Sequence, residues 1–114
     1  MVSSTAIPIA TAAIETFECG PGGECLKGTA ETINAPQFIR LDFSTKTAHA
    51  TRPDGEERTT AIRSLSQDKG ELILQGVQEG LGWSMAITQE NGKMALTAAG
   101  DRVAFVLFGA CTGL

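Results

Sequence analysis

The sequence predicts an all-β protein, a small antiparallel meander barrel of about eight strands. Apolar and polar residues alternate over most of the chain, and turn-forming residues recur at short intervals. Sustained helical periodicity is absent from the sequence. The 114 residues suit a single domain, and a hydrophobic fraction of 42% suits a packed core. A β-sandwich built from the same strands is the alternative.

The second half of the chain carries the clearest strand pattern. Strands are expected there at residues 71–77, 82–88, 93–99 and 102–110. The turns between them are residues 78–81, the pair Asn91-Gly92 and the pair Gly100-Asp101. Asn-Gly is the strongest short signal for a hairpin, because both central positions of a type I′ turn have positive φ.

These turns set the expected strand register. A four-residue turn at 78–81 places Gly76 opposite Trp83, where a glycine leaves room for the indole ring. Two-residue turns at the other two sites produce further apolar pairs, Met85 with Ala98 and Leu96 with Phe105. All three assignments gather the large apolar side chains on one face of the sheet, which is the main argument for the fold.

The first half has candidate strands at residues 13–18, 25–33, 38–43, 46–52 and 57–65, followed by a loop at 66–70. Residues 1–12 end in an Ala-x-Ala pattern without a positive amino-terminal region or a long apolar core. We interpret them as an amino-terminal extension, either an ordinary terminus or the remnant of an export signal. Residues 13–114 then form the single β-barrel domain.

Three cysteines allow at most one intramolecular disulfide. We expect it between Cys19 and Cys25, because the short Gly-Pro-Gly-Gly-Glu segment between them is a turn former. Pairing of either residue with Cys111 is the alternative. A zinc site would need all three cysteines and His49 to converge, and a disulfide with one remaining thiol explains the same residues without a metal.

The composition argues against several classes of function. The chain has one histidine, no tyrosine and no Cys-x-x-Cys pair, so we expect no catalytic residues and no cofactor. Its formal net charge is -4 and its basic residues are scattered, which argues against nucleic-acid binding. No stretch of the sequence approaches the roughly 20 apolar residues of a transmembrane helix.

An apolar stripe on the last strand is the first candidate for binding. Residues 103–108 are apolar at successive positions, so Val106 and Phe108 are expected to point outward while their neighbours fill the core. Such a patch often marks a protein partner or a homodimer interface. Cover of the stripe by residues 7–14 is the alternative.

Two further places are candidates. Arg40 and Asp42 are expected on the outward face of their strand near His49, where a charged trio could hold an anion or a carboxylate. Ordinary cross-strand pairing explains the same residues. The other place is the barrel mouth near Trp83 and Gly76.

Several segments resemble a group of small, uncharacterised exported proteins of alphaproteobacteria: residues 38–43 (FIRLDF), 52–55 (RPDG), 74–77 (LQGV), 82–87 (GWSMAI) and 108–112 (FGACT). This resemblance implies export and compactness, but no activity. The segment Phe17-Glu18-Cys19, the pair Gly82-Trp83 and Cys111 are similar to positions in periplasmic inhibitors of c-type lysozyme, which are eight-stranded barrels. The chain lacks that family's serine- and lysine-bearing inhibitory loop, so the inhibitory residues cannot be transferred.

We therefore expect a non-enzymatic binding or interaction module, exported to the periplasm or secreted, that binds a protein partner or itself. An inhibitor-like protein and a homodimer are two forms of this hypothesis. The alternative is a carrier of a small apolar ligand in the barrel mouth. An enzyme of unknown reaction is the third hypothesis.

Overall fold

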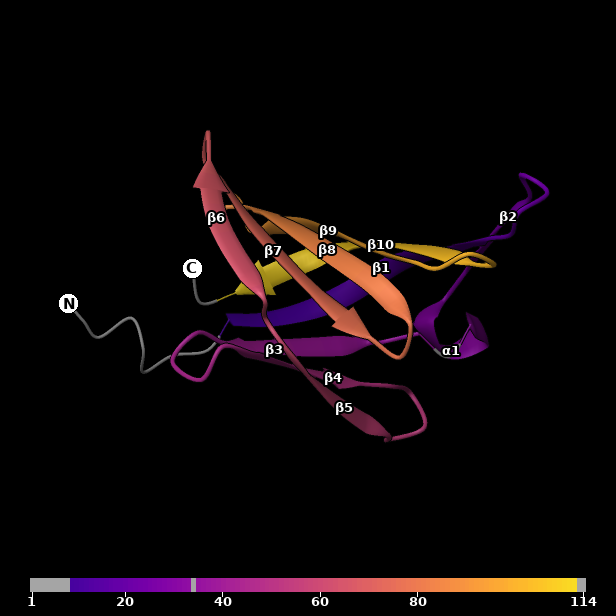
Figure 1. Ribbon diagram of the computed structural model, residues 1–114, viewed down its shortest axis with the longest axis horizontal. Coiled ribbons are helices and arrows are strands. Elements are labelled where there is room, and N and C mark those ends of the chain that lie inside the picture. Colours follow the sequence, from indigo (N-terminus) through magenta and orange to yellow (C-terminus); the bar gives the residue numbers. More distant parts are fainter. Residues whose placement is uncertain (1–8, 34, 113–114) are drawn as a thin grey trace.

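The computed structural model describes residues 9–33 and 35–112, which form one curled antiparallel sheet (Figure 1). Its strands are β1 Ile9–Cys19, β2 Cys25–Gly28, β3 Phe38–Asp42, β4 Thr47–Thr51, β5 Glu57–Ala61, β6 Ser64–Asp68, β7 Glu71–Gln78, β8 Leu81–Thr88, β9 Lys93–Ala99 and β10 Ala104–Thr112. The helix α1 is a single turn, Ala30–Ile33. The predicted all-β, barrel-like fold is therefore confirmed.

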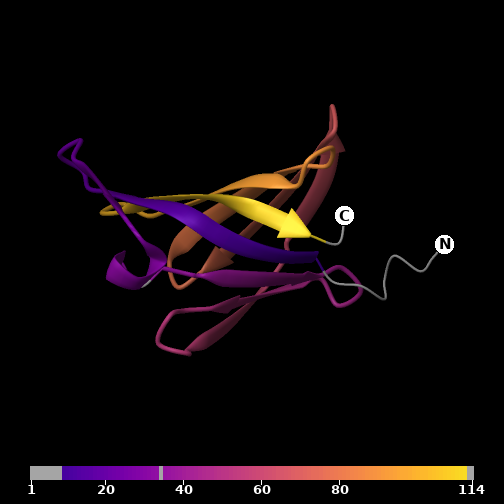
Figure 2. The same ribbon diagram turned by 180° about the vertical axis from the view of Figure 1, so that it is seen from behind.

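Neighbouring strands in the sheet are mostly consecutive in sequence, as in a meander, except that the first strand is inserted between the third and the last. Along the sheet the order is β5-β4-β3-β1-β10-β9-β8-β7-β6, and β2 pairs with β1 outside this path. Strand β1 lies between β3 and β10, so it joins an early strand to the last one. Figure 2 shows β1 and β10 side by side along most of their length.

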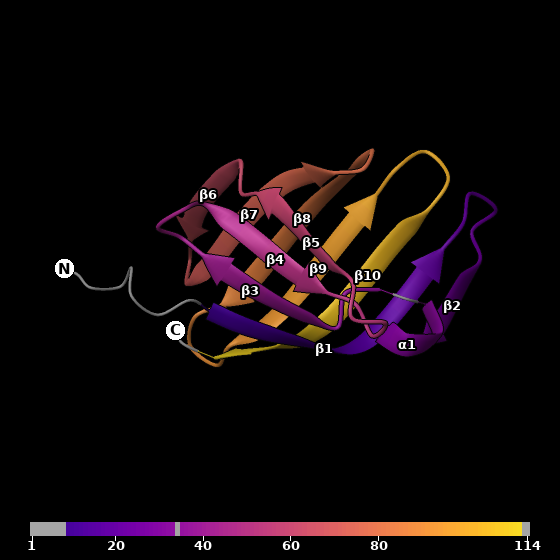
Figure 3. The same ribbon diagram turned by 90° about the horizontal axis from the view of Figure 1, so that it is seen from below.

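The chain itself draws the two edges of the sheet together. Strands β5 and β6 are the edges of the sheet order, yet they are consecutive in sequence. In the link between them, the Ile62 N–H donates to the Lys46 carbonyl at 2.8 Å and extends the β4–β5 ladder, whereas the Arg63 N–H donates to the Gln75 carbonyl at 2.8 Å and extends the β6–β7 ladder. Figure 3 shows β3, β4 and β5 crossing in front of β7 to β10, so two sides of the curled sheet face each other. The arrangement is barrel-like rather than a sandwich of two separate sheets.

The inner face of the sheet holds the apolar core. Its largest buried side chains come from β1, β3 and β7 to β10: Ile9, Ile39, Leu41, Leu74, Trp83, Met85, Ile87, Met94, Leu96 and Leu107. Phe105 is partly buried against the same cluster. The prediction that Trp83, Met85 and Phe105 share one side of the sheet is confirmed.

The register of the β7–β8 hairpin is confirmed, and the next two registers are wrong by two residues. Gly76 lies opposite Trp83, as predicted. Met85, however, pairs with Leu96, and Leu96 pairs with Leu107. These two connections are longer than two-residue turns. A shift of two residues leaves every side chain on its predicted face, because the period of a strand is two.

Two other turns are of the two-residue type. The expected four-residue turn at 78–81 is one of them: Gln78 pairs with Leu81, and φ is 51° at Glu79 and 82° at Gly80 between them. The second turn joins β6 to β7. Asp68 pairs with Glu71, and the two residues between them have positive φ, 50° at Lys69 and 81° at Gly70. The expected loop at residues 66–70 is therefore wrong, since β6 runs to Asp68. The expected strand 57–65 is also divided, because the chain turns from one sheet edge to the other at residues 62–63.

Two corrections concern the amino-terminal part. Strand β1 begins at Ile9, so residues 9–12 belong to the sheet and the domain boundary at residue 13 lies too late. The remainder of the expected extension, residues 1–8, lies outside the described residues. The expected strand 25–33 ends at Gly28, and α1 follows. The Thr29 hydroxyl accepts a hydrogen bond from the Thr32 N–H at 3.2 Å, which caps this helical turn.

Candidate functional site

One end of the barrel contains a small cavity, which we call the mouth cavity. It has a volume of about 130 Å³. Apolar side chains form most of its wall: Pro36, Ile39, Ala48, Ala50, Leu81, Trp83, Met85, Leu96 and Ala98. Polar side chains complete it: Arg52, Arg58, Thr60, Gln78 and Glu79. Strands β7 and β9 end here and β5 and β8 begin here, so the antiparallel meander brings these distant residues together.

Trp83 is the largest side chain of this cavity. It is 9% exposed, and its indole ring lies over Gly76 on the neighbouring strand. A Cβ atom at Gly76 would come within 2.6 Å of the indole Nε1, so only glycine leaves room for the ring in this position. The indole N–H is buried, and none of the described residues supplies an acceptor for it.

Two arginines turn inward at the same end. Ala50 pairs with Arg58, which places the Arg58 side chain on the inner face of the sheet, and Arg52 continues the alternation of β4 beyond Ala50. Glu56 binds both guanidinium groups, at 2.9 Å from Arg52 Nη1 and 3.1 Å from Arg58 Nη2. Glu79 binds Arg58 Nη1 at 3.3 Å. The Nε–H groups of both arginines are buried without acceptors.

The mouth cavity can therefore hold a compact apolar group beside hydrogen-bond donors. Its volume is close to that of an engineered apolar cavity of about 150 Å³ that binds benzene, and it is smaller than the roughly 300 to 1,000 Å³ of a typical ligand pocket. Trp83 was a predicted binding residue, and the structure places it in this site. The two arginines were missed, although Ala48, Ala50 and Arg52 alternate in the sequence.

The predicted outer stripe, Val106 and Phe108, lies on the outer face of β10. Phe108 is 44% exposed and Val106 is partly buried. Phe17 of β1 packs its ring edge-on against Phe108, with the ring centroids 6.2 Å apart. Residues 9–14 lie beside β10 within the sheet and do not cross its outer face, whereas residues 7–8 are outside the described part of the chain.

Of the predicted charged trio Arg40, Asp42 and His49, the structure brings only Arg40 and His49 together as a pair. Arg40 lies directly opposite His49 on the outer face. Asp42 instead serves the turn between β3 and β4: its Oδ1 accepts hydrogen bonds from the Ser44 hydroxyl at 2.7 Å and the Thr45 N–H at 3.3 Å. The bond from the Ser44 hydroxyl is the main reason that the pKa of Asp42 lies below its usual value.

A larger depression of about 650 Å³ lies on this outer face, with Phe38, Arg40 and His49 among its lining residues. It is wide open to solvent. Both ring nitrogens of His49 already have hydrogen-bond partners, the Thr47 hydroxyl at 3.1 Å and the Thr59 hydroxyl at 3.0 Å. His49 therefore has no ring nitrogen left for a ligand. The mouth cavity is smaller, but the side chains that line it carry N–H groups without acceptors among the described residues.

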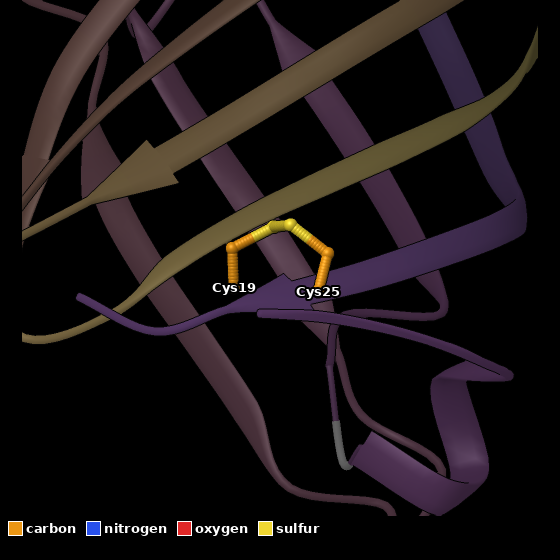
Figure 4. Close-up of a disulfide and its surroundings, with 2 residues drawn as sticks. All are labelled: Cys19 and Cys25. Atoms are coloured by element: carbon orange, nitrogen blue, oxygen red, sulfur yellow. A yellow bond between two sulfur atoms is a disulfide. The ribbon is translucent and has the colours of Figure 1, made fainter. Parts of the chain in front are cut away.

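The predicted disulfide between Cys19 and Cys25 is present and joins β1 to β2 (Figure 4). These two sulfurs therefore cannot act as the thiolate ligands of a zinc ion. Cys111 is a buried free thiol 2.9 Å from the Thr11 hydroxyl, and burial raises its pKa. Within residues 9–33 and 35–112, no three His, Cys, Asp or Glu side chains are grouped to hold a metal.

Comparisons of the chain with models of protein families, with curated proteins and with solved structures give no match. Among the described residues, no helix has the length and apolar character to cross a membrane.

Proposed function

We propose that this protein is a non-enzymatic binding module whose ligand enters the mouth cavity beside Trp83. The observation that carries the proposal is the combination of a largely apolar wall with three N–H groups on lining side chains that are buried without an acceptor among the described residues. A buried donor without an acceptor costs roughly 1 to 3 kcal/mol, so each such group needs an explanation. All three side chains line the cavity, so an acceptor on a ligand bound there would satisfy donors of this set.

The shape of the cavity gives a direct test of this proposal. Ala98 lines the mouth cavity, whereas Ala95 lies on the outer face of the same strand, opposite Ala86 and Phe108. Filling the cavity by Ala98→Leu should weaken the binding of compact apolar probes such as toluene by roughly tenfold or more. The matched variant Ala95→Leu should leave their binding unchanged.

Binding can be followed by the fluorescence of Trp83, the only tryptophan of the chain. Toluene and similar probes are titrated into wild type and both variants at equal protein concentration. The proposal requires a saturable change in wild type and in Ala95→Leu. An unchanged spectrum across the whole panel, or equal affinities for both variants, would contradict it.

A second candidate function is binding of a protein partner or self-association through the outer stripe. The supporting observation is that Phe108 stays 44% exposed even with Phe17 against it. Sedimentation of wild type and Phe108→Glu tests self-association. A wild-type dimer that the substitution dissociates supports this function, and a monomer in both samples removes the homodimer version.

We further propose that the protein is exported to the periplasm or secreted. The Cys19–Cys25 disulfide supports this location, because disulfides persist mainly in oxidising compartments. Fractionation of the native cells, with thiol labelling before and after reduction, provides the test. Recovery of the protein in the cytoplasm with both thiols reduced would contradict the proposed location.

A further inference from the structure

We infer that the mouth cavity selects a neutral carbonyl oxygen carried on a compact apolar body, as in a ketone, an ester or an amide. This inference rests on the proposed function and adds the chemistry of the ligand's polar end. It follows from three properties of the site: the kind of polar group that lacks a partner, the balance of charge around the cavity, and the exposure of the side chains at its rim.

All three unpartnered groups are donors. The indole N–H of Trp83 and the Nε–H groups of Arg52 and Arg58 have no acceptor, and neither side chain type can accept a hydrogen bond. A ligand hydroxyl or amine would bring donors as well, whereas these three groups need only an acceptor. The ligand's polar atom must therefore be an acceptor, and a carbonyl oxygen accepts two hydrogen bonds through its two lone pairs.

The charge around the cavity favours a neutral acceptor over a carboxylate. Arg52 and Arg58 supply two positive charges, and Glu56 and Glu79, which contact them, supply two negative charges. The site thus has no surplus positive charge, and the whole chain is negative. A carboxylate entering it would lose its hydration and meet two other carboxylates, whereas a ketone loses far less solvation.

Both arginines lie at the rim of the cavity, where a ligand can reach them. Their side chains are 26% exposed at Arg52 and 38% exposed at Arg58, so neither is enclosed by the core. Thr60 is different, because its hydroxyl already donates to the Val77 carbonyl at 2.9 Å across the gap between β5 and β7. The recognition therefore depends on the two guanidinium groups and the indole.

Three probes test the inference: cyclohexanone and methylenecyclohexane, which have the same shape, and the larger, charged cyclohexanecarboxylate. The first two differ only in an oxygen that replaces a methylene group. We expect cyclohexanone to bind roughly tenfold more tightly than methylenecyclohexane, from one or two new hydrogen bonds, and more tightly than the carboxylate. The single indole N–H signal of Trp83 in a ¹⁵N–¹H spectrum should shift with the ketone.

Equal binding of the ketone and the alkene would overturn the inference and leave the proposed function standing. Tighter binding of the carboxylate would overturn the neutral preference. Binding of none of the three probes would overturn the proposed function as well.

Arg58→Lys keeps a positive charge between Glu56 and Glu79 but removes the Nε–H group, so the preference for the ketone over the alkene should fall severalfold. The matched variant Arg102→Lys changes an exposed arginine in the β9–β10 connection and should keep the wild-type preference. An unchanged preference in Arg58→Lys would contradict the role of the guanidinium. Trp83→Phe, if folded, provides a second measure, since it removes the indole donor and keeps a ring.

Discussion

Gly76 determines where the only tryptophan lies. A methyl group at this position would meet the Trp83 ring at 2.5 to 2.6 Å, and the ring is enclosed by the core. Gly76→Ala should therefore lower the free energy of unfolding by about 1 to 3 kcal/mol, as overpacking does. Urea unfolding followed by Trp83 fluorescence measures this loss.

Gly82 is the matched control in the same hairpin. A Cβ atom built there meets nothing within 4 Å, and its side of the sheet is solvent-exposed. Gly82→Ala should change the unfolding free energy by no more than about 0.5 kcal/mol. Equal losses in the two variants would show that crowding by the indole ring is not the reason for the glycine.

Asp42 makes stability depend on pH in acid solution. The folded state lowers its pKa through hydrogen bonds, first from the Ser44 hydroxyl and next from the Thr45 N–H. Its contribution is therefore present above the unfolded-state pKa of about 3.9 and is lost as pH falls through the lower folded-state pKa. Asp42→Ala should reduce the urea midpoint at pH 7, and the difference from wild type should narrow below pH 4.

Asp101→Ala, at an exposed position in another turn, is the control for this series. Asp42→Asn keeps an acceptor oxygen without the charge, so it should retain part of the turn and lose the acid dependence. A difference in urea midpoint between wild type and Asp42→Ala that stays constant from pH 7 to pH 2 would contradict the role of the Asp42 carboxylate in acid stability.

The residues of the mouth cavity differ in how far the sequence predicts their positions. Trp83 and Gly76 could be placed together because one local hairpin decides their pairing. Arg52 and Arg58 could not, because charged residues are expected on the outer face of a sheet. Their inward position depends on Glu56 and Glu79, which come from two separate turns that neutralise them at the barrel mouth.

For the strands, the sequence predicted the buried face of each strand correctly, but not which residues pair across two of the hairpins. The Asn91-Gly92 pair favoured a type I′ turn, which needs positive φ at both residues. Only Gly92 has positive φ, 76°, and its N–H donates to the Thr88 carbonyl at 2.8 Å across a longer loop. The register moved by two residues, and the buried face stayed the same. The alternation of apolar and polar residues thus predicts which face of the sheet a side chain lies on, whereas the length of the loop determines which residue it pairs with on the next strand.

The pairing of β1 with β10 depends on a close approach at Gly109. A Cβ atom at this position would clash with the Ala12 carbonyl oxygen, beside the irregularity between Ala13 and Glu15 in the β1–β10 register. Backbone atoms cannot move aside as a flexible side chain can. Gly109→Ala should therefore lower the unfolding free energy by about 2 kcal/mol or more and loosen both strands.

Amide hydrogen exchange distinguishes this local effect from a general one. In Gly109→Ala, exchange should accelerate first in β1 and β10 and only later in β7 and β8. Gly20→Ala is the control, because nothing lies within 4 Å of a Cβ atom at that position. Uniform acceleration over all strands would contradict a special role for the β1–β10 contact.

For the whole molecule, the curled sheet was predictable, but the way its two ends come together was not. Strands β5 and β6 do not pair in the described sheet, so closure rests on the chain between them and on the Thr60–Val77 hydrogen bond. Turn signals at short intervals and one apolar face suffice for a curled meander. The insertion of β1 between β3 and β10 joins residues that are far apart in sequence, such as Thr11 and Cys111, and no local pattern reports such a pairing. The division of the expected strand 57–65 follows from the same closure.

Closure of the barrel should depend on Ile62, which lies where the chain passes from β5 to β6. Its side chain is 7% exposed within the core, and its N–H extends the β4–β5 ladder by donating to the Lys46 carbonyl. Ile62→Ala should lower the unfolding free energy by about 2 to 4 kcal/mol, because it leaves a cavity at the seam. Leu65 on β6 is 51% exposed, so Leu65→Ala should cost less than about 1 kcal/mol.

The two variants also separate local opening from global unfolding. If the 62–63 segment holds the edges together, limited proteolysis of Ile62→Ala should cut between β5 and β6 under conditions where Leu65→Ala and wild type stay intact. The mouth cavity lies between the strands that this segment joins, since Arg58 and Thr60 of β5 line it together with Gln78 of β7. Ile62→Ala should consequently weaken probe binding in the cavity even at temperatures where the protein remains folded. Intact binding in a variant already cut at the seam would show that the cavity forms without closure of the barrel.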